Sequence, residues 1–118
     1  MKIQESAQDY LEAILMISKR QEKVRASDIC TFFGYSRPSV SVALKHFREN
    51  GLIEMDGNYI HLTEEGLKIA TNMYERHQTL SDIFIKIGVS QETAFSDACK
   101  IEHDLSEETY QALKNHFL

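Results

Sequence analysis

Three residues near the end of the chain, Cys99, Glu102 and His103, bring together a thiol, a carboxyl and an imidazole group. Their i, i+3 and i+4 spacing places all three side chains on one face of an α-helix. A thiolate, a carboxylate and an imidazole on one face favour binding of a divalent transition metal. The residues therefore predict a metal site, with an ordinary surface pair of Glu102 and His103 as the alternative.

Other residues with the same kinds of donor atoms lie elsewhere in the sequence. Asp9 and Glu12 are three residues apart on the expected first helix, and His77 lies on a long helix further on. Each has a simpler explanation, because acidic residues are usually solvated and a lone histidine is usually structural. A manganese or iron ion needs about five or six ligands, and sequence spacing alone does not bring these residues together.

The chain around these residues is expected to be mainly helical. Apolar residues at helical spacing, with capping residues at their ends, predict six helices: 3–19, 26–33, 36–50, 64–87, one from Ser90 through Asp104, and one begun by Ser106. Asp56-Gly57 separates two apolar runs, 52–55 and 58–62, and predicts a β-hairpin. Two short helices, a turn, a third helix and a two-stranded wing are the order of a winged helix-turn-helix domain.

The helix over 36–50 would be the recognition helix of such a domain. Its exposed positions are richer in basic than in acidic residues, although the whole chain has a net charge of −5. Basic and hydroxyl side chains suit contacts with DNA phosphates, while a solvated amphipathic helix is the alternative. The residues expected to bind DNA are Arg25, Ser36, Arg37, Pro38, Ser39, Ser41, Lys45 and Arg48.

The composition limits the class of protein. The 118 residues, 42% of them hydrophobic and 26% charged, suit one globular domain or two small ones that share a core. The longest strictly apolar run, 13–17, is too short to span a bilayer, so no membrane partner is expected. Two cysteines and no signal-peptide pattern at the start predict a cytoplasmic protein with reduced thiols.

Several segments of the chain together resemble a known family. They are Asp9 to Glu12, Arg37 to Ser41, Thr63 to Gly66, Glu75 to His77, and Asp97 to Ser106. Over almost its whole length the chain resembles the diphtheria-toxin-repressor family of metal-dependent repressors, and especially its small branch, the manganese transport regulators. The block from Asp97 to Ser106 is the most specific part of this resemblance.

The resemblance implies a fold and a function. The fold would be mainly α, with a winged helix-turn-helix DNA-binding domain over 1–62 and a helical metal-binding and dimerisation domain over 63–118. The function would be metal-dependent repression of metal homeostasis genes, by a homodimer that binds double-stranded DNA at a pseudo-palindromic operator. The implied metal ligands are Asp9, Glu12, His77, Cys99, Glu102 and His103, and Ser39 with its neighbours would contact DNA.

Some residues depart from either branch of the family. Cys99 matches the iron-responsive branch, whereas the acidic pair Asp9 and Glu12 matches the manganese branch. Ser81 and Phe95 stand where the iron branch has ligands of an ancillary site, and Val42 replaces a glutamine of its recognition helix. We therefore expect Fe²⁺ or Mn²⁺ as the physiological ion, while Zn²⁺, Co²⁺ or Ni²⁺ would bind in vitro.

Two other classes of function remain open at this stage. A winged-helix interaction module that needs no metal would use His77 and Cys99 only for packing. A metalloenzyme is the less favoured reading, because the sequence has no zinc-protease motif, nucleophile elbow or phosphate loop. Dimerisation is also expected from apolar residues predicted to be exposed on the C-terminal helices: Phe95, Ile101, Leu105, Tyr110, Leu113 and Phe117.

Overall fold

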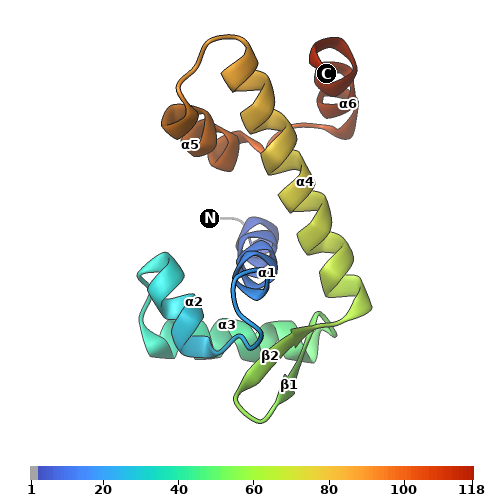
Figure 1. The fold of residues 1–118 in the computed structure, drawn as a ribbon. Coiled ribbons are helices and arrows are strands. Elements are labelled where there is room, and N and C mark those ends of the chain that lie inside the picture. Colours follow the sequence, from blue (N-terminus) through green and yellow to red (C-terminus); the bar gives the residue numbers. More distant parts are fainter. Residues whose placement is uncertain (1–2) are drawn as a thin grey trace. The chain divides into compact units, whose positions relative to one another are not determined.

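The computed structural model describes residues 3–118, with side chains from residue 7 onward. The described elements are α1 (Ile3–Ser18), α2 (Ala26–Phe33), α3 (Arg37–Glu49), β1 (Ile53–Asp56), β2 (Tyr59–Leu62), α4 (Glu64–Lys86), α5 (Gln91–Ile101) and α6 (Glu107–Phe117) (Figure 1). This order confirms the expected fold class, helices with a small two-stranded wing. The chain forms two compact units. The first ends at Thr71 and the second begins at Asn72, both inside α4.

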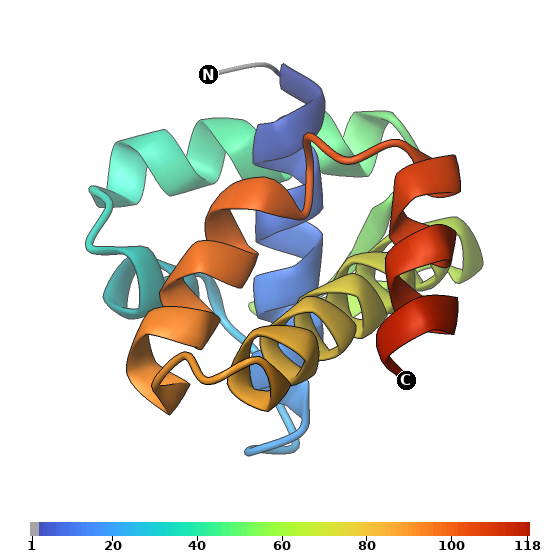
Figure 2. The ribbon, with the colours of Figure 1, turned by 90° about the horizontal axis from the view of Figure 1, so that it is seen from above.

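The first unit has the order of a winged helix-turn-helix, and its core is formed by α1, α2, α3, the hairpin and the beginning of α4. Viewed from above, α1 crosses α3 (Figure 2). Gly34, with φ 75°, ends α2, and its N–H donates to the carbonyl of Cys30 at 2.8 Å. Ser36 then begins α3, because its Oγ accepts a hydrogen bond from the backbone N–H of Ser39 at 3.3 Å.

The wing differs from the sequence expectation in its turn. Asp56 pairs with Tyr59 across the antiparallel hairpin, so the turn consists of Gly57 and Asn58 and not of Asp56 and Gly57. Gly57 has φ 61°, while no described residue other than glycine has a positive φ. A positive φ at only the first turn residue is the pattern of a type II′ turn, which favours glycine there.

The junction between the wing and α4 is tightly packed. Thr63 Oγ1 donates to the carbonyl of Gly51 at 2.7 Å and accepts from the N–H of Gly66 at 3.1 Å, which caps α4. A Cβ atom on Gly66 would overlap the carbonyl oxygen of Leu52. Glycine is therefore required at this position by the close approach of two backbones, and not by its own dihedral angles.

In the second unit α5 and α6 lie on either side of the C-terminal part of α4 (Figures 1 and 2). Leu80, Ala98 and Tyr110 form its buried core. Burial of Tyr110, which is 4% exposed, corrects the expectation that this side chain is exposed, whereas Phe95 is 46% exposed as expected. Ile101, Leu105, Leu113 and Phe117 are half-buried. Within the described residues, no helix is both long enough and apolar enough to cross a bilayer.

The end of α5 also differs from the expectation. Ser90 and Ser106 cap α5 and α6 as expected, but α5 ends at Ile101 and does not continue through Asp104. The sequence after Ile101 contains no glycine or proline that would signal this end. At this end Arg76 of α4 donates to the carbonyl of Glu102 and so satisfies an acceptor at the helix terminus.

Candidate metal centre and nucleic-acid interface

Four of the expected metal ligands lie together in the second unit. His77 comes from α4, Cys99 from α5, and Glu102 and His103 from the turn that follows α5. His77 Nδ1 is 3.2 Å from Glu102 Oε2 and 3.6 Å from Cys99 Sγ. His103 Nε2 is 3.5 Å from Glu102 Oε1. Glu102 therefore lies between the two imidazoles, with one carboxylate oxygen toward each.

The surrounding residues explain why the four side chains meet. His77 and Glu102 are 2% and 1% exposed, so both are held inside the protein. Phe95, one helical turn before Cys99, forms a T-shaped contact with the His77 ring, with centroids 4.3 Å apart and an interplanar angle of 77°. An aromatic ring packed in this way restricts the orientation of the imidazole. Phe95 thus has a packing role where the iron branch of the family would have a ligand.

The arrangement corrects the expectation that one helical face carries the three C-terminal donors. Cys99 lies on α5, Glu102 caps this helix, and His103 lies beyond its end. The set is completed by His77 from a different helix. One thiol, one carboxylate and two imidazoles with neighbouring atoms 3.2–3.6 Å apart fit the chemistry of a transition-metal ion.

Asp9 and Glu12 lie on α1 in the first unit, one helical turn apart. Four of the six expected ligands are thus brought together within one unit, and ligation by Asp9 and Glu12 stays a prediction. Cys30, the other cysteine, is half-buried and packs against the apolar core of the first unit, as expected for a structural thiol.

The surface of α3 has the composition expected of a recognition helix. Val40, Leu44 and Phe47 point into the core, and the other side is solvated. All the expected DNA-binding residues of this segment are exposed: Ser36, Arg37, Pro38, Ser39, Ser41, Lys45 and Arg48. Ser36 Oγ also donates to Ser39 Oγ at 2.9 Å, so one hydroxyl orients the next at the start of the helix.

A cationic cluster beside strand β2 of the wing was only partly found from the sequence. Arg25 Nη2 donates to Tyr59 Oη at 3.2 Å, and Lys23 Nζ lies 4.5 Å from the centre of the Tyr59 ring. The hydrogen bond from Arg25, with the positive charge of Lys23, lowers the pKa of Tyr59. Arg25 was expected to bind DNA and Lys23 to add positive charge beside it, but the contact of both with Tyr59 was missed. The available signal was Lys23-Val24-Arg25, in which two cations alternate with a buried valine.

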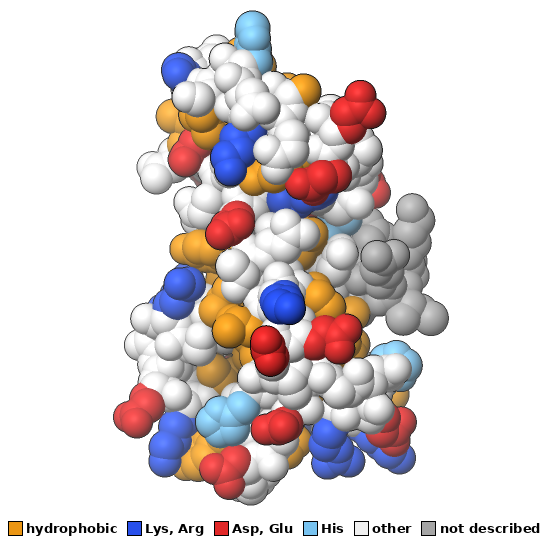
Figure 3. Space-filling view, turned by 90° about the vertical axis from the view of Figure 1, so that its right-hand side faces the viewer, with side chains coloured by type: hydrophobic (Ala, Val, Ile, Leu, Met, Phe, Trp, Pro, Cys, Tyr) orange, Lys and Arg blue, Asp and Glu red, His pale blue; other side chains and the backbone are white. Residues whose placement is uncertain are grey.

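Acidic and basic side chains are mixed on the face shown in Figure 3. Figure 3 shows one face of the described residues, on which Asp and Glu alternate with Lys and Arg and with hydrophobic groups. The chain has 13 Lys and Arg residues against 18 Asp and Glu residues. Positive charge for an anionic polymer must therefore be provided locally, as it is by α3 and by the cluster of Lys23, Arg25 and Tyr59.

Both halves of the chain match models of one protein family. Residues 2–62 match "Iron dependent repressor, N-terminal DNA binding domain". Residues 63–117 match "Iron dependent repressor, metal binding and dimerisation domain". The chain belongs to the iron-dependent repressor family. The resemblance seen in the sequence is thereby confirmed.

Similarity to individual proteins supports this family assignment. The chain is 38% identical over 107 residues to the transcriptional regulator MntR of Escherichia coli O6:H1, over 90% of this chain and 69% of the relative. It is 31% identical over 102 residues to the HTH-type transcriptional regulator MntR of Bacillus subtilis strain 168, over 86% of this chain and 72% of the relative.

A solved structure shares the fold. The structure of a manganese-dependent transcriptional repressor in complex with manganese superposes with a TM-score of 0.85 and 26% identity, over 94% of this chain. The match covers 52% of that structure, so the chain spans about half the length of this neighbour.

Proposed function

We propose that this protein is a DNA-binding transcriptional repressor whose affinity for its operator depends on a divalent metal ion. The observation that carries the proposal is the convergence of His77, Cys99, Glu102 and His103 in a chain whose first unit is a winged helix-turn-helix. Membership of the iron-dependent repressor family and similarity to transcriptional regulators support it. A role as regulator, and not as enzyme, is part of the proposal.

The proposed ligand set has six members. Asp9 and Glu12 of α1 would join His77, Cys99, Glu102 and His103, and the ion would be Fe²⁺ or Mn²⁺. Without metal, three carboxylates and a Cys99 thiolate repel one another when close together. The bound ion supplies positive charge that removes this repulsion. Because α1 contributes to the core around α3, ligation by Asp9 and Glu12 would transmit metal occupancy to the DNA-binding unit.

The assembly and the setting belong to the same proposal. A homodimer would present two copies of α3 to a pseudo-palindromic double-stranded operator, with half-sites about one or more helical turns apart. Residues 1–62 would bind DNA and residues 63–118 would bind metal and form the dimer, as the two family descriptions suggest. The genes regulated would be those of metal homeostasis, and the protein would act in the cytoplasm.

The test compares DNA binding with and without Mn²⁺ or Fe²⁺, under anaerobic conditions, for the wild type and two variants. Glu102→Gln keeps the size of the side chain but removes a charged ligand, so metal-stimulated DNA affinity should fall by on the order of tenfold or more. Ser39→Ala should weaken DNA binding modestly with metal affinity unchanged, because Ser39 lies on α3 and is not one of the expected metal ligands. Circular dichroism serves as the control for folding of both variants.

The result also separates the proposal from its alternatives. DNA binding by the wild type that is strong without metal and unchanged by it would favour a metal-independent winged-helix module. Metal-stimulated binding that is the same in Glu102→Gln would rule out the proposed ligand set.

A further inference from the structure

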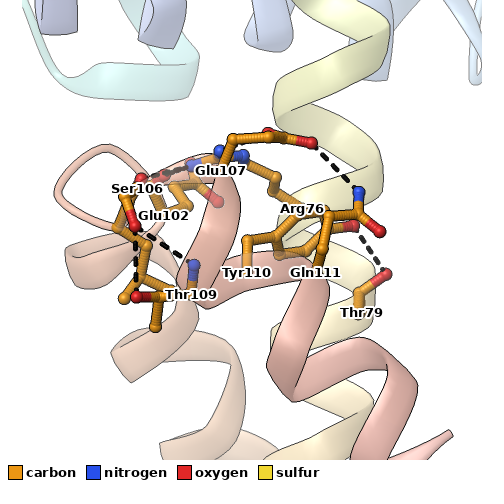
Figure 4. Close-up of polar contacts among 9 residues, drawn as sticks. Arg76, Thr79, Glu102, Ser106, Glu107, Thr109, Tyr110 and Gln111 are labelled. Atoms are coloured by element: carbon orange, nitrogen blue, oxygen red, sulfur yellow. Dashed lines mark hydrogen bonds and ion pairs between the residues drawn. The ribbon is translucent and has the colours of Figure 1, made fainter.

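Arg76, the residue before His77 on α4, is a buried cation whose side chain is 8% exposed. Its Nη1 donates to the backbone carbonyl oxygens of Glu102 and Leu105, each at 2.9 Å. Its Nη2 donates to Glu107 Oε2 at 2.8 Å (Figure 4). A buried guanidinium is costly unless its charge and its N–H groups find partners, and here both terminal nitrogens do, whereas Nε has none among the described residues. These contacts therefore favour one arrangement of Arg76, the turn after α5 and the Glu107 carboxylate.

The first group held by Arg76 is the turn between α5 and α6. Its backbone is fixed at Glu102 and again at Leu105 by the same nitrogen atom. The side chains of Glu102 and His103 project from this short segment. The end of a helix leaves carbonyl groups without intrahelical partners, so their acceptor determines the path of the following chain. Arg76 is thus in a position to orient both donor side chains without contacting a metal itself.

The second group held by Arg76 is the start of α6. Glu107 lies in the first turn of α6, and its other carboxylate oxygen accepts from Gln111 Nε2 at 3.0 Å. The Arg76 guanidinium lies 4.9 Å from the centre of the Tyr110 ring. Tyr110 Oη in turn donates to Thr79 Oγ1 on α4 at 3.1 Å (Figure 4). One cation therefore connects α6 with the turn that carries two expected metal ligands.

We propose that Arg76 is a positioning residue that couples metal binding at Glu102 and His103 to the docking of α6 on α4. The inference rests on the proposed function and adds to it a route by which metal occupancy reaches the last helix. A metal ion that fixes Glu102 and His103 selects one conformation of the turn, and the same conformation aligns both carbonyls with Arg76. By linkage, docking of α6 through Glu107 strengthens metal binding by the same factor.

The test uses Co²⁺ as the probe, because its visible absorption reports both affinity and coordination geometry. Glu107→Gln removes the negative charge that pairs α6 with Arg76. The variant should fold, because the Glu107 side chain is 65% exposed. Glu108→Gln is the matched control, with the same change of charge in the same first turn of α6. We expect Glu107→Gln to weaken Co²⁺ binding by about tenfold, as for other residues that orient metal ligands, and Glu108→Gln to bind as the wild type does.

A second variant tests Arg76 itself. Arg76→Lys keeps the positive charge, but an ammonium group cannot reproduce the planar fork that reaches two carbonyls and a carboxylate. We expect weaker Co²⁺ binding and a changed Co²⁺ spectrum, which loss of general stability would not produce. Should Arg76→Lys fail to fold, as judged by circular dichroism, Glu107→Gln and its control decide the question.

Amide hydrogen exchange provides the readout for α6. Added Co²⁺ should slow exchange over residues 108–118 in the wild type and in Glu108→Gln, and should do so much less in Glu107→Gln. Co²⁺ affinity and α6 protection in Glu107→Gln equal to those of the wild type would overturn the coupling. So would metal binding by the wild type that leaves α6 exchange unchanged. A wild type that binds Co²⁺ with α6 protection but shows no metal effect on DNA would instead overturn the repressor proposal alone.

Discussion

His77 has neighbours of opposite chemical character, and they determine what this residue can bind. On one side are the Cys99 sulfur and a Glu102 oxygen, and on another is the ring of Phe95. The thiol is a soft ligand, whereas the carboxylate is a hard one. The residue types were recognisable in the sequence. Their distances were not, because they depend on the turn after α5 and on the partner helix α4.

The first prediction concerns selectivity for the metal ion. Cys99→Glu replaces the soft donor of the site by a hard one, so operator binding should shift toward activation by Mn²⁺. The measurement is the concentration of Mn²⁺ and of Fe²⁺ that gives half-maximal DNA binding, under anaerobic conditions, for both proteins. The Mn²⁺ to Fe²⁺ ratio of these concentrations should fall in the variant. An unchanged ratio would mean that Cys99 packs beside the ion without selecting it.

At the scale of elements, the end of α5 was the helix boundary that the sequence placed least well. Ser36, Ser90 and Ser106 each cap the helix that the sequence assigned to them. A start is encoded locally, by a side chain that reaches an N–H two or three residues away. The end of α5 has a partner that is distant in sequence, because Arg76 of α4 donates to the carbonyl of Glu102.

The second prediction concerns the start of α4. Gly66→Ala would normally stabilise a helix, but here the added Cβ meets the carbonyl oxygen of Leu52. We expect the free energy of unfolding to fall by about 1–3 kcal/mol, as for other overpacked sites. Urea unfolding followed by circular dichroism provides the measurement, with the exposed neighbour in Glu65→Ala as the control. A variant more stable than the wild type would contradict the close approach.

The third prediction concerns the pH dependence of α6. Hydrogen bonds from Gln111 and Arg76, with the charge of Arg76, lower the pKa of Glu107. A carboxyl group with a lowered pKa in the folded state contributes stability above its unfolded pKa, roughly 4.3, and this contribution is lost as the pH falls further. Metal-free Glu107→Gln should therefore be less stable than the wild type near neutral pH, and the difference should shrink in acid.

Urea unfolding at a series of pH values measures this difference. Glu108→Gln, which changes the charge without the contact to Arg76, serves as the control. A difference between the wild type and Glu107→Gln that stays constant below pH 4, roughly the pKa range of an ordinary glutamate, would show that the ion pair does not stabilise the fold.

At the scale of the whole molecule, much of the architecture was predictable because its signals are local. The two short helices, the turn at Gly34, the third helix and the wing follow from capping residues and from hydrophobic spacing. The division of the chain at Thr71 and Asn72 was not predictable. Helical periodicity continues across these residues, so nothing in the local sequence indicates that α4 leaves the core of the first unit and enters that of the second.

The fourth prediction concerns assembly. Large apolar side chains of the second unit remain exposed, among them Ile87 at 59% and Phe95 at 46%. Apolar surface of this kind, in a chain matched by a dimerisation family model, favours a homodimer. Light scattering at micromolar concentration, with and without Mn²⁺, should give twice the mass of one chain. A single-chain mass in the presence of metal would contradict the prediction.

The continuity of α4 has a consequence for modularity. Ala70 is buried in the first core and Leu80 in the second, and both belong to this one helix. A gene fusion that joined two relatives at 62/63, where the family matches meet, would give the first core an Ile69 and an Ala70 from a foreign parent. Chimeras of this family should therefore inherit the beginning of α4 together with the wing. The segment that must be exchanged as one piece is longer than the segment that sequence similarity defines.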